Sequence, residues 1–266
     1  METKLLMIHG NGGARSRFLP FLQELYQQPV AFTPVIPELP GFEGRVLPPA
    51  NDYWDLFIRA LQAAVEQHGA SAPWVLYGHG IGGSMLLEWG RRGYGLPGDP
   101  GWQPQKVILH SCIGASLKKR LFPKLMKPMF IRRLLHRLIP WKPMQRIWER
   151  KLFQYPERIP QAVRDRFFAD YQQCAAFPVF FDLIDPAWYT QAQQALKTYP
   201  FYFLWGDRER VVASRYLTLW QSDFPNSHFE VVPDWDHFPM LDDPGAFQQK
   251  IAQIVTAQGP MTIKHE

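Results

Sequence analysis

Short apolar runs alternate with longer stretches of helical periodicity along most of this 266-residue chain, and this alternation constrains the fold more than any other feature. The runs typical of strands are residues 5–9, 30–36, 74–77, 106–110, 201–205 and 229–232. Helical patterns cover residues 15–28, 52–68, 81–94, a stretch from about 213, and 244–256. Strands separated by helices build βαβ units around a parallel sheet. The sequence therefore predicts an α/β fold with a mostly parallel sheet flanked by helices.

The alternation stops between residues 113 and 195. This segment looks helical throughout, and eight prolines divide it into short pieces. An insertion of this size between two strands predicts a helical cap. We therefore expect one core built from residues 1–112 and 196–266, with a cap at 113–195.

Composition excludes several classes of protein. No run of 18 apolar residues is present, so we expect no transmembrane helix. The N-terminus lacks the layout of a signal peptide, and the two cysteines, Cys112 and Cys174, have neither a disulfide framework nor metal-ligand spacing. The expected location is the cytoplasm, with reduced thiols. No metal and no organic cofactor is expected.

A glycine-rich turn follows the expected strand 74–77 and precedes the expected helix 81–94. Its sequence is Gly78-His79-Gly80-Ile81-Gly82-Gly83. A strand, a tight turn and a helix are the setting of the nucleophile elbow G-x-S-x-G, here with glycine at the centre. The same glycines could cradle a dinucleotide phosphate, which also requires an acid about 20 residues further on. Asp99 is nearby but lies in a proline-glycine loop, which disfavours that alternative.

Two further loops carry an acid and a histidine. Residues 205–212 read WGDRERVV and follow one late strand, and residues 234–239 read DWDHFP and follow the last one. A carboxylate beyond a strand can accept the Nδ1 proton of a histidine and fix its tautomer. An elbow, an acid and a histidine, in that order along the chain, is the arrangement expected of a catalytic triad on a parallel sheet.

These motifs resemble the α/β-hydrolase superfamily over nearly the whole chain. The turn at 78–83 is similar to the elbow G-H-S-x-G-G of esterases and meta-cleavage hydrolases, and in haloalkane dehalogenases and epoxide hydrolases the frame reads G-H-D-W-G. His9-Gly-Asn-Gly-Gly resembles the oxyanion loop of the family, and Leu39-Pro-Gly-Phe resembles the loop after its next strand. The resemblance implies an α/β-hydrolase fold with a helical cap.

Carried over by position, the resemblance assigns a role to each motif residue. Gly80 occupies the nucleophile position, Glu209 that of the acid and His237 that of the histidine. Asp207 is a second candidate for the acid, two residues too early. The backbone N–H groups of Asn11 and Ile81 would form the oxyanion hole. The residues expected to contact substrate are His9, Gly10, His79 and Phe238.

Glycine at position 80 makes a covalent intermediate at that residue impossible. Ser84, Ser111 and Cys112 lie nearby, but none has an evident partner base. Three hypotheses remain open. His237, oriented by Glu209, could act as a general base without a covalent step. Alternatively, the chain is a hydrolase disabled at residue 80, or a non-catalytic protein that binds a ligand or partner in the old pocket.

Charge is concentrated in the cap. Residues 116–151 contain 12 Lys or Arg and one acid, Glu149, giving +11 in a chain of net charge +5. The cations are interleaved with bulky apolar residues, including Phe122, Phe130 and Trp141. This pattern fits an amphipathic cap helix with solvated charges, a surface that lies on anionic lipid, or recognition of an acidic substrate or protein. Nucleic-acid binding is not expected, because no recognised motif is present.

The substrate expectation follows from the aromatic content. Aromatic side chains make up 15% of the chain, which favours a pocket with apolar walls between cap and sheet. A hydrophobic small molecule, such as an ester or another carbonyl compound, is the expected ligand.

Overall fold

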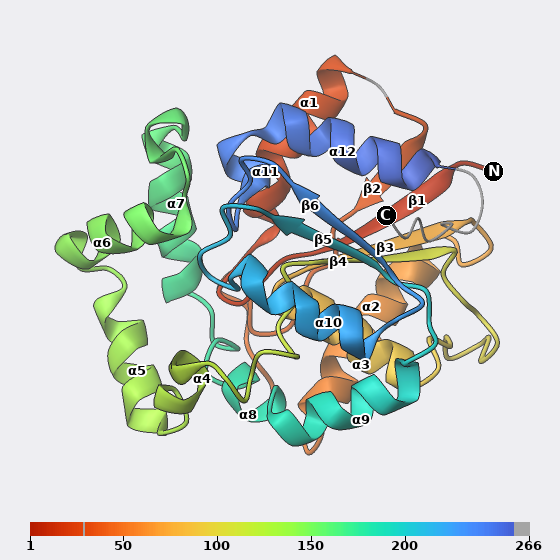
Figure 1. The fold of residues 1–266 in the computed structure, drawn as a ribbon, viewed down its shortest axis with the longest axis horizontal. Coiled ribbons are helices and arrows are strands. Elements are labelled where there is room, and N and C mark those ends of the chain that lie inside the picture. The colour runs from red at the N-terminus through yellow and green to blue at the C-terminus, as the bar shows by residue number, and fades with distance from the viewer. Residues whose placement is uncertain (29, 258–266) are drawn as a thin grey trace.

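The computed structural model describes residues 1–28 and 30–257. Its centre is a six-stranded sheet in the order β2-β1-β3-β4-β5-β6, in which every neighbouring pair is parallel (Figure 1). The strands are β1 (Thr3–Ile8), β2 (Phe32–Val35), β3 (Trp74–His79), β4 (Lys106–His110), β5 (Tyr202–Gly206) and β6 (His228–Val232). The predicted α/β class, with a parallel sheet flanked by helices, is confirmed.

Helices cover both faces of the sheet (Figure 1). One face carries α1 (Leu19–Gln27), α11 (Pro239–Asp242) and α12 (Pro244–Thr256), and α1 packs against α12. The other carries α2 (Tyr53–Gln67), α3 (Ile81–Arg91), α9 (Pro186–Leu196) and α10 (Leu217–Asp223). Because both faces are covered, the strands β3 and β5 are buried along their whole length.

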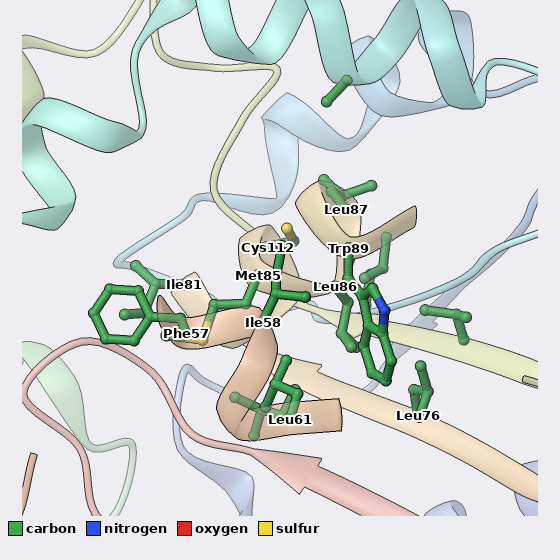
Figure 2. Close-up of a cluster of buried hydrophobic side chains, with 14 of the residues drawn as sticks. Phe57, Ile58, Leu61, Leu76, Ile81, Met85, Leu86, Leu87, Trp89 and Cys112 are labelled. Carbon is green, nitrogen blue, oxygen red and sulfur yellow. The ribbon is translucent and has the colours of Figure 1, made fainter. Parts of the chain in front are cut away.

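The core beneath α2 and α3 is packed with large apolar side chains. Phe57, Ile58 and Leu61 of α2 meet Met85 and Leu86 of α3 above the sheet (Figure 2). The residues of α2 that face inward recur at helical spacing, which is the pattern an amphipathic helix needs to bury one side. Asp52 caps this helix, accepting a hydrogen bond from the Asp55 N–H at 3.1 Å.

Five helices follow β4 and gather beyond the carboxyl ends of the strands (Figure 1). They are α4 (Leu121–Leu125), α5 (Met129–Leu138), α6 (Lys142–Leu152), α7 (Gln161–Gln172) and α8 (Phe180–Leu183). Short 3-10 turns lie at Arg15–Phe18, Pro156–Arg158 and Ser214–Tyr216. Arg132 of α5 is buried and holds this assembly together, because it pairs with both carboxylate oxygens of Asp182 and donates to the Pro178 carbonyl.

The predicted division into core and cap stays a prediction. The helix α9 falls within the range predicted for the cap, yet it packs against α3, and its Trp188 donates to the buried Glu88 at 3.0 Å. Residues 258–266 of the predicted core lie outside the described residues.

Most element boundaries differ from those expected by a few residues, and three of these differences have a clear local form. The helix expected from residue 15 begins as a 3-10 turn and becomes α-helical only at Leu19, next to Pro20. The helix expected to reach residue 94 ends at Arg91, because Gly93 (φ +98°) and Tyr94 (φ +58°) adopt left-handed backbone. The strand expected at 74–77 extends to His79. Among the described residues no helix is long and apolar enough to cross a bilayer.

Candidate active site

The carboxyl ends of five strands bring the predicted site residues to one edge of the sheet. Pairing places Ile8 beside Gly78, His79 beside His110, and Gly206 beside Val232, so the loops that follow these strands start at the same level. This edge is where open parallel sheets bind ligands.

The turn after β3 has the backbone geometry of an elbow. Gly80 has φ +55° and ψ −116°, a conformation that a residue with a side chain rarely adopts. Its N–H donates to the His110 carbonyl of the neighbouring strand at 2.9 Å. The helix α3 begins directly afterwards at Ile81, so the turn is fixed by a strand on one side and a buried helix on the other.

The glycines around Gly80 are required by close packing, whereas Gly80 itself is not. A Cβ atom on Gly78 would lie 2.5 Å from the Gly82 carbonyl carbon, and one on Gly82 would lie 2.5 Å from the Ile8 carbonyl oxygen. A Cβ on Gly80 would meet only the Gly10 Cα, at 3.6 Å, which is ordinary van der Waals contact. The position retains the room in which a nucleophile side chain would stand.

Glu209 follows β5 and is buried. Its Oε1 accepts the backbone N–H groups of Val211 and Val212 at 2.7 and 2.8 Å, and its Oε2 accepts the Ser111 hydroxyl at 2.5 Å and His237 Nδ1 at 2.8 Å. Burial alone would raise the pKa of Glu209, but His237, the Ser111 hydroxyl and the Val212 amide lower it to about 2. The carboxylate is therefore ionised and can accept the imidazole proton.

His237 lies between Glu209 and the cavity. Because Nδ1–H donates to the carboxylate, Nε2 is left with its lone pair, a tautomer assigned from this hydrogen bond. The backbone of the loop is fixed as well, since the His237 N–H donates to Asp236 at 2.8 Å and the His237 carbonyl accepts His79 Nε2–H at 2.8 Å. The arrangement suits a general base.

The two loops after β5 and β6 can approach each other because of Gly206. A Cβ at this position would lie 2.0 Å from the Trp235 carbonyl oxygen. The same oxygen accepts the Arg208 N–H at 3.0 Å. Asp207, the second candidate for the acid, is exposed and lies beside Arg208 instead of His237.

The predicted oxyanion groups lie against the same space. Asn11 and Ile81 both line the cavity, and within residues 1–28 and 30–257 neither backbone N–H has a hydrogen-bond acceptor. The Asn11 loop is held by its own side chain, which accepts the Gly12 N–H at 3.0 Å and donates to the Phe177 carbonyl at 3.1 Å. Free amides at a helix start and in a glycine loop can stabilise a developing oxyanion.

A cavity of about 410 Å³ opens over these groups. Gly10, His79 and Phe238, predicted to contact substrate, line it together with Gly80 and His237. Most of the remaining wall is apolar and comes from the insertion: Ile113, Leu135, Ile139, Trp148, Phe167, Phe168, Phe177, Phe180 and Phe181. His9 is not among the described residues that line it; its ring bonds the Gly10 carbonyl and packs edge-on against Phe42.

The hydroxyl and thiol groups of the three candidate side chains near Gly80 are bonded to other groups or protonated. Ser84 is buried and donates to the Ile113 carbonyl at 2.9 Å. Ser111 is occupied by Glu209. Burial raises the pKa of Cys112 to about 12, so its thiol stays protonated at neutral pH.

Three residues that support the site carry no sequence signal for doing so. Asp236 is buried and holds both the His237 amide and the Arg210 side chain, and Arg210 in turn donates to the carbonyls of Arg150 and Phe153 at the end of α6. Arg17 donates to the Gly12 carbonyl behind the Asn11 loop. Ser111 positions Glu209. The contacts of Ser111 with Glu209 and of Arg210 with the Arg150 and Phe153 carbonyls join segments far apart in the chain, so spacing could not reveal them.

Comparisons with known proteins agree with the observed fold. The family model described as the alpha/beta hydrolase family matches residues 5–249. No curated protein matches the chain.

Solved structures with the same fold are numerous. A bromoperoxidase from Bacillus anthracis superposes with a TM-score of 0.72 at 14% identity, covering 97% of this chain and 93% of its own. An esterase from Exiguobacterium antarcticum gives 0.71 at 13% identity, with 97% and 94% covered. An esterase from a Rhodococcus species gives 0.67 at 14% identity, with 97% and 92% covered. At these identities the likeness concerns the fold, and together with the family match it leads to one conclusion: the chain belongs to the alpha/beta hydrolase family.

Proposed function

We propose that this protein acts on a hydrophobic ester or related carbonyl compound by general-base catalysis, with no covalent intermediate. In this mechanism His237, oriented by the ionised Glu209, removes a proton from a water molecule as that water attacks the substrate carbonyl. The proton moves to Nε2, the oxygen of water bonds to the carbonyl carbon, and the carbonyl π electrons move to oxygen. Collapse of the tetrahedral species expels the alcohol, which takes the proton back from the imidazolium.

The observation that carries the proposal is the space at Gly80. The dyad and the two free amides surround a position that a Cβ atom would enter without a clash. In a covalent hydrolase the nucleophile fills that position, whereas here a water molecule can occupy it. The attacking oxygen would then stand between the base and the oxyanion donors, as the chemistry requires.

The wall of the cavity supports the choice of substrate. Its many aromatic and aliphatic side chains match an acyl or aryl group. The esterases among the structural neighbours support the same reaction class.

The test is an ester-hydrolysis assay on chromogenic esters of increasing chain length. The protein should turn over medium-chain esters, and His237→Ala should lower kcat by about 10²–10⁴-fold, the usual contribution of a general base. Gly80→Ala should also lower kcat, because the added methyl group takes the space of the water. Intact-protein mass spectrometry during turnover should show no acyl adduct.

Gly80→Ser separates the competing explanations, with Gly80→Ala as its control for backbone strain and lost space. A protein that is inactive as it stands but becomes active and acylated as Gly80→Ser is a disabled hydrolase. A protein that binds the ester equally well with and without His237, and hydrolyses it in neither form, is a binding protein. Either result would contradict the general-base mechanism.

A further inference from the structure

The face formed by α4, α5 and α6 combines a concentration of exposed apolar side chains with many unpaired cations. Of the thirteen large apolar side chains exposed within the described residues, eight lie between positions 121 and 147. They are Leu121, Phe122, Leu125, Met129, Phe130, Leu134, Trp141 and Ile147, with Phe130 70% and Trp141 57% exposed. Large apolar patches on a protein surface mark binding sites.

Cations are interleaved with these apolar side chains along single helix faces. On α5 the exposed residues Phe130, Arg133, Leu134 and Arg137 recur at three- and four-residue intervals, so they share one side of the helix. On α6 the exposed Arg146, next to Ile147, is followed one turn later by Arg150 and Lys151.

Most cations of this face have no internal partner. Within residues 1–28 and 30–257 no carboxylate oxygen lies within 4.0 Å of nine of them: Lys118, Lys119, Lys124, Lys127, Arg133, Arg137, Arg146, Arg150 and Lys151. Outside residues 116–151 the chain carries a net charge of −6, the difference between +5 and +11. The molecule is therefore strongly polarised, with its positive end at the cap.

We propose that the α4–α6 face docks on an anionic lipid bilayer. The apolar side chains would enter the interface between head groups and acyl chains, while the neighbouring Lys and Arg side chains contact lipid phosphates. An acidic protein would satisfy the charges but would leave the large apolar side chains on the same helix faces without a comparable environment. The bilayer supplies both.

Docking through this face would bring the bilayer close to the cavity. Lys118, Phe122, Lys124 and Lys127 belong to the same face and also line the cavity over His237. An amphiphile leaving the bilayer would reach the cavity without crossing water. The docking proposal is independent of the reaction, because it concerns binding to the bilayer and is tested without turnover.

Vesicle co-sedimentation tests the proposal. The intact protein is mixed with vesicles of phosphatidylcholine alone, or with phosphatidylserine added, at low and high salt. It should sediment with the anionic vesicles at low salt and be released at high salt. Each cation near an anionic surface contributes about 1 kcal/mol, roughly fivefold in affinity, so Arg133→Gln with Arg137→Gln should weaken binding roughly 30-fold.

Matched controls separate the face from nonspecific charge and hydrophobicity. Phe130→Ser with Trp141→Ser should weaken binding, whereas Tyr26→Ser, at a side chain 89% exposed on α1, should not. Lys197→Gln with Arg215→Gln removes the same charge from exposed positions elsewhere and should leave binding unchanged. All the substituted side chains are exposed, so folding should be retained, which circular dichroism can check.

Several results would overturn the proposal: no sedimentation with anionic vesicles at low salt, equal sedimentation with neutral vesicles, or equal losses in the face and control variants. Binding to soluble polyglutamate as tight as that to the anionic vesicles would also overturn it, because it would point to an acidic protein as the partner.

Discussion

Charged groups have internal hydrogen-bond partners at the carboxyl edge of the sheet, whereas most of those on the α4–α6 face have none. At the edge, Glu209 is buried and all of its bonding capacity is used by backbone amides, a hydroxyl and an imidazole. On the face, most cations stand beside exposed apolar side chains and have no carboxylate within 4.0 Å among the described residues, the exceptions being Arg132 and Lys142. Polar groups in a buried network must bond to one another, because a buried group without a hydrogen-bond partner destabilises the fold. Exposed charged groups are hydrated and can remain without a protein partner until a ligand binds. The charged groups at the edge are therefore fully bonded within the protein, whereas most of those on the face remain available to a ligand.

The largest expected effect comes from a steric clash between the loops that carry Glu209 and His237. Gly206→Ala should lower the free energy of unfolding by roughly 3 kcal/mol or more, because its Cβ would overlap the Trp235 carbonyl and force the Glu209 and His237 loops apart. Gly98→Ala is the control, since its Cβ would meet nothing within 4 Å. Urea unfolding measures both, and equal stability of the two variants would show that the loops do not depend on this contact.

Lowering the pH should destabilise the carboxyl edge of the sheet more than the α4–α6 face. Burial lowers the pKa of His9 to about 4 and of His110 to about 3, and it lowers the pKa of His79 well below 6.5. Below pH 6.5 the unfolded chain then binds more protons than the native protein, so stability is lost as the pH falls from 6.5 toward 4.

Two buried acids, Asp242 and Asp236, oppose this loss, because burial raises the pKa of each. Burial raises the pKa of Asp242 from 3.8 to about 6, so the native protein binds an extra proton between those values and gains stability as the pH falls. These three histidines, together with His228, whose pKa burial also lowers, outweigh the two carboxyl groups. Urea midpoints at pH 7, 6 and 5 should therefore decrease in that order, and Asp242→Asn should make the decrease steeper. A midpoint that rises toward pH 5 would contradict the assignment of neutral buried histidines.

A smaller effect is expected from Ser111→Ala. It removes one hydrogen bond to the Glu209 carboxylate and should cost about 1–3 kcal/mol, because three other donors remain on that group. The activity of the dyad should also fall, with a change in the pH profile of kcat that a merely structural loss would not give. An unchanged pH profile would mean that Ser111 only packs there.

The smallest effect on stability is expected on the face. Phe130→Ser should change the free energy of unfolding by no more than about 0.5 kcal/mol, because the side chain is 70% exposed. Its effect should be seen in vesicle binding alone. A loss of several kcal/mol by urea unfolding would show that Phe130 belongs to the packed interior of the cap, and the contrast between the two regions would fail.

The fold was largely predictable because periodicity is local. The strand at Lys106–His110 and the helix at Pro244–Thr256 have the predicted bounds, since each is an apolar or amphipathic run with clear ends. The contact of His237 with Glu209 also agrees with the expected order of strand, acid and histidine, although its catalytic role stays a prediction. Hydrogen-bond partners that tertiary packing brings together could not be predicted from the sequence. Ser111 donates to an acid 98 residues away, and Arg17 donates to the Phe167 carbonyl 150 residues away.

Arg210 connects the two regions that were contrasted above. It holds Asp236, whose other oxygen fixes the His237 amide, and it also holds two carbonyls at the end of α6. A shift of α6 must therefore either break these bonds or displace the histidine loop. If binding at the α4–α6 face shifts α6, Arg210 would pass that shift to the histidine loop, and occupancy of the cavity would then alter binding at the face by the same factor. Such reciprocity would make the cap a sensor of what the cavity holds.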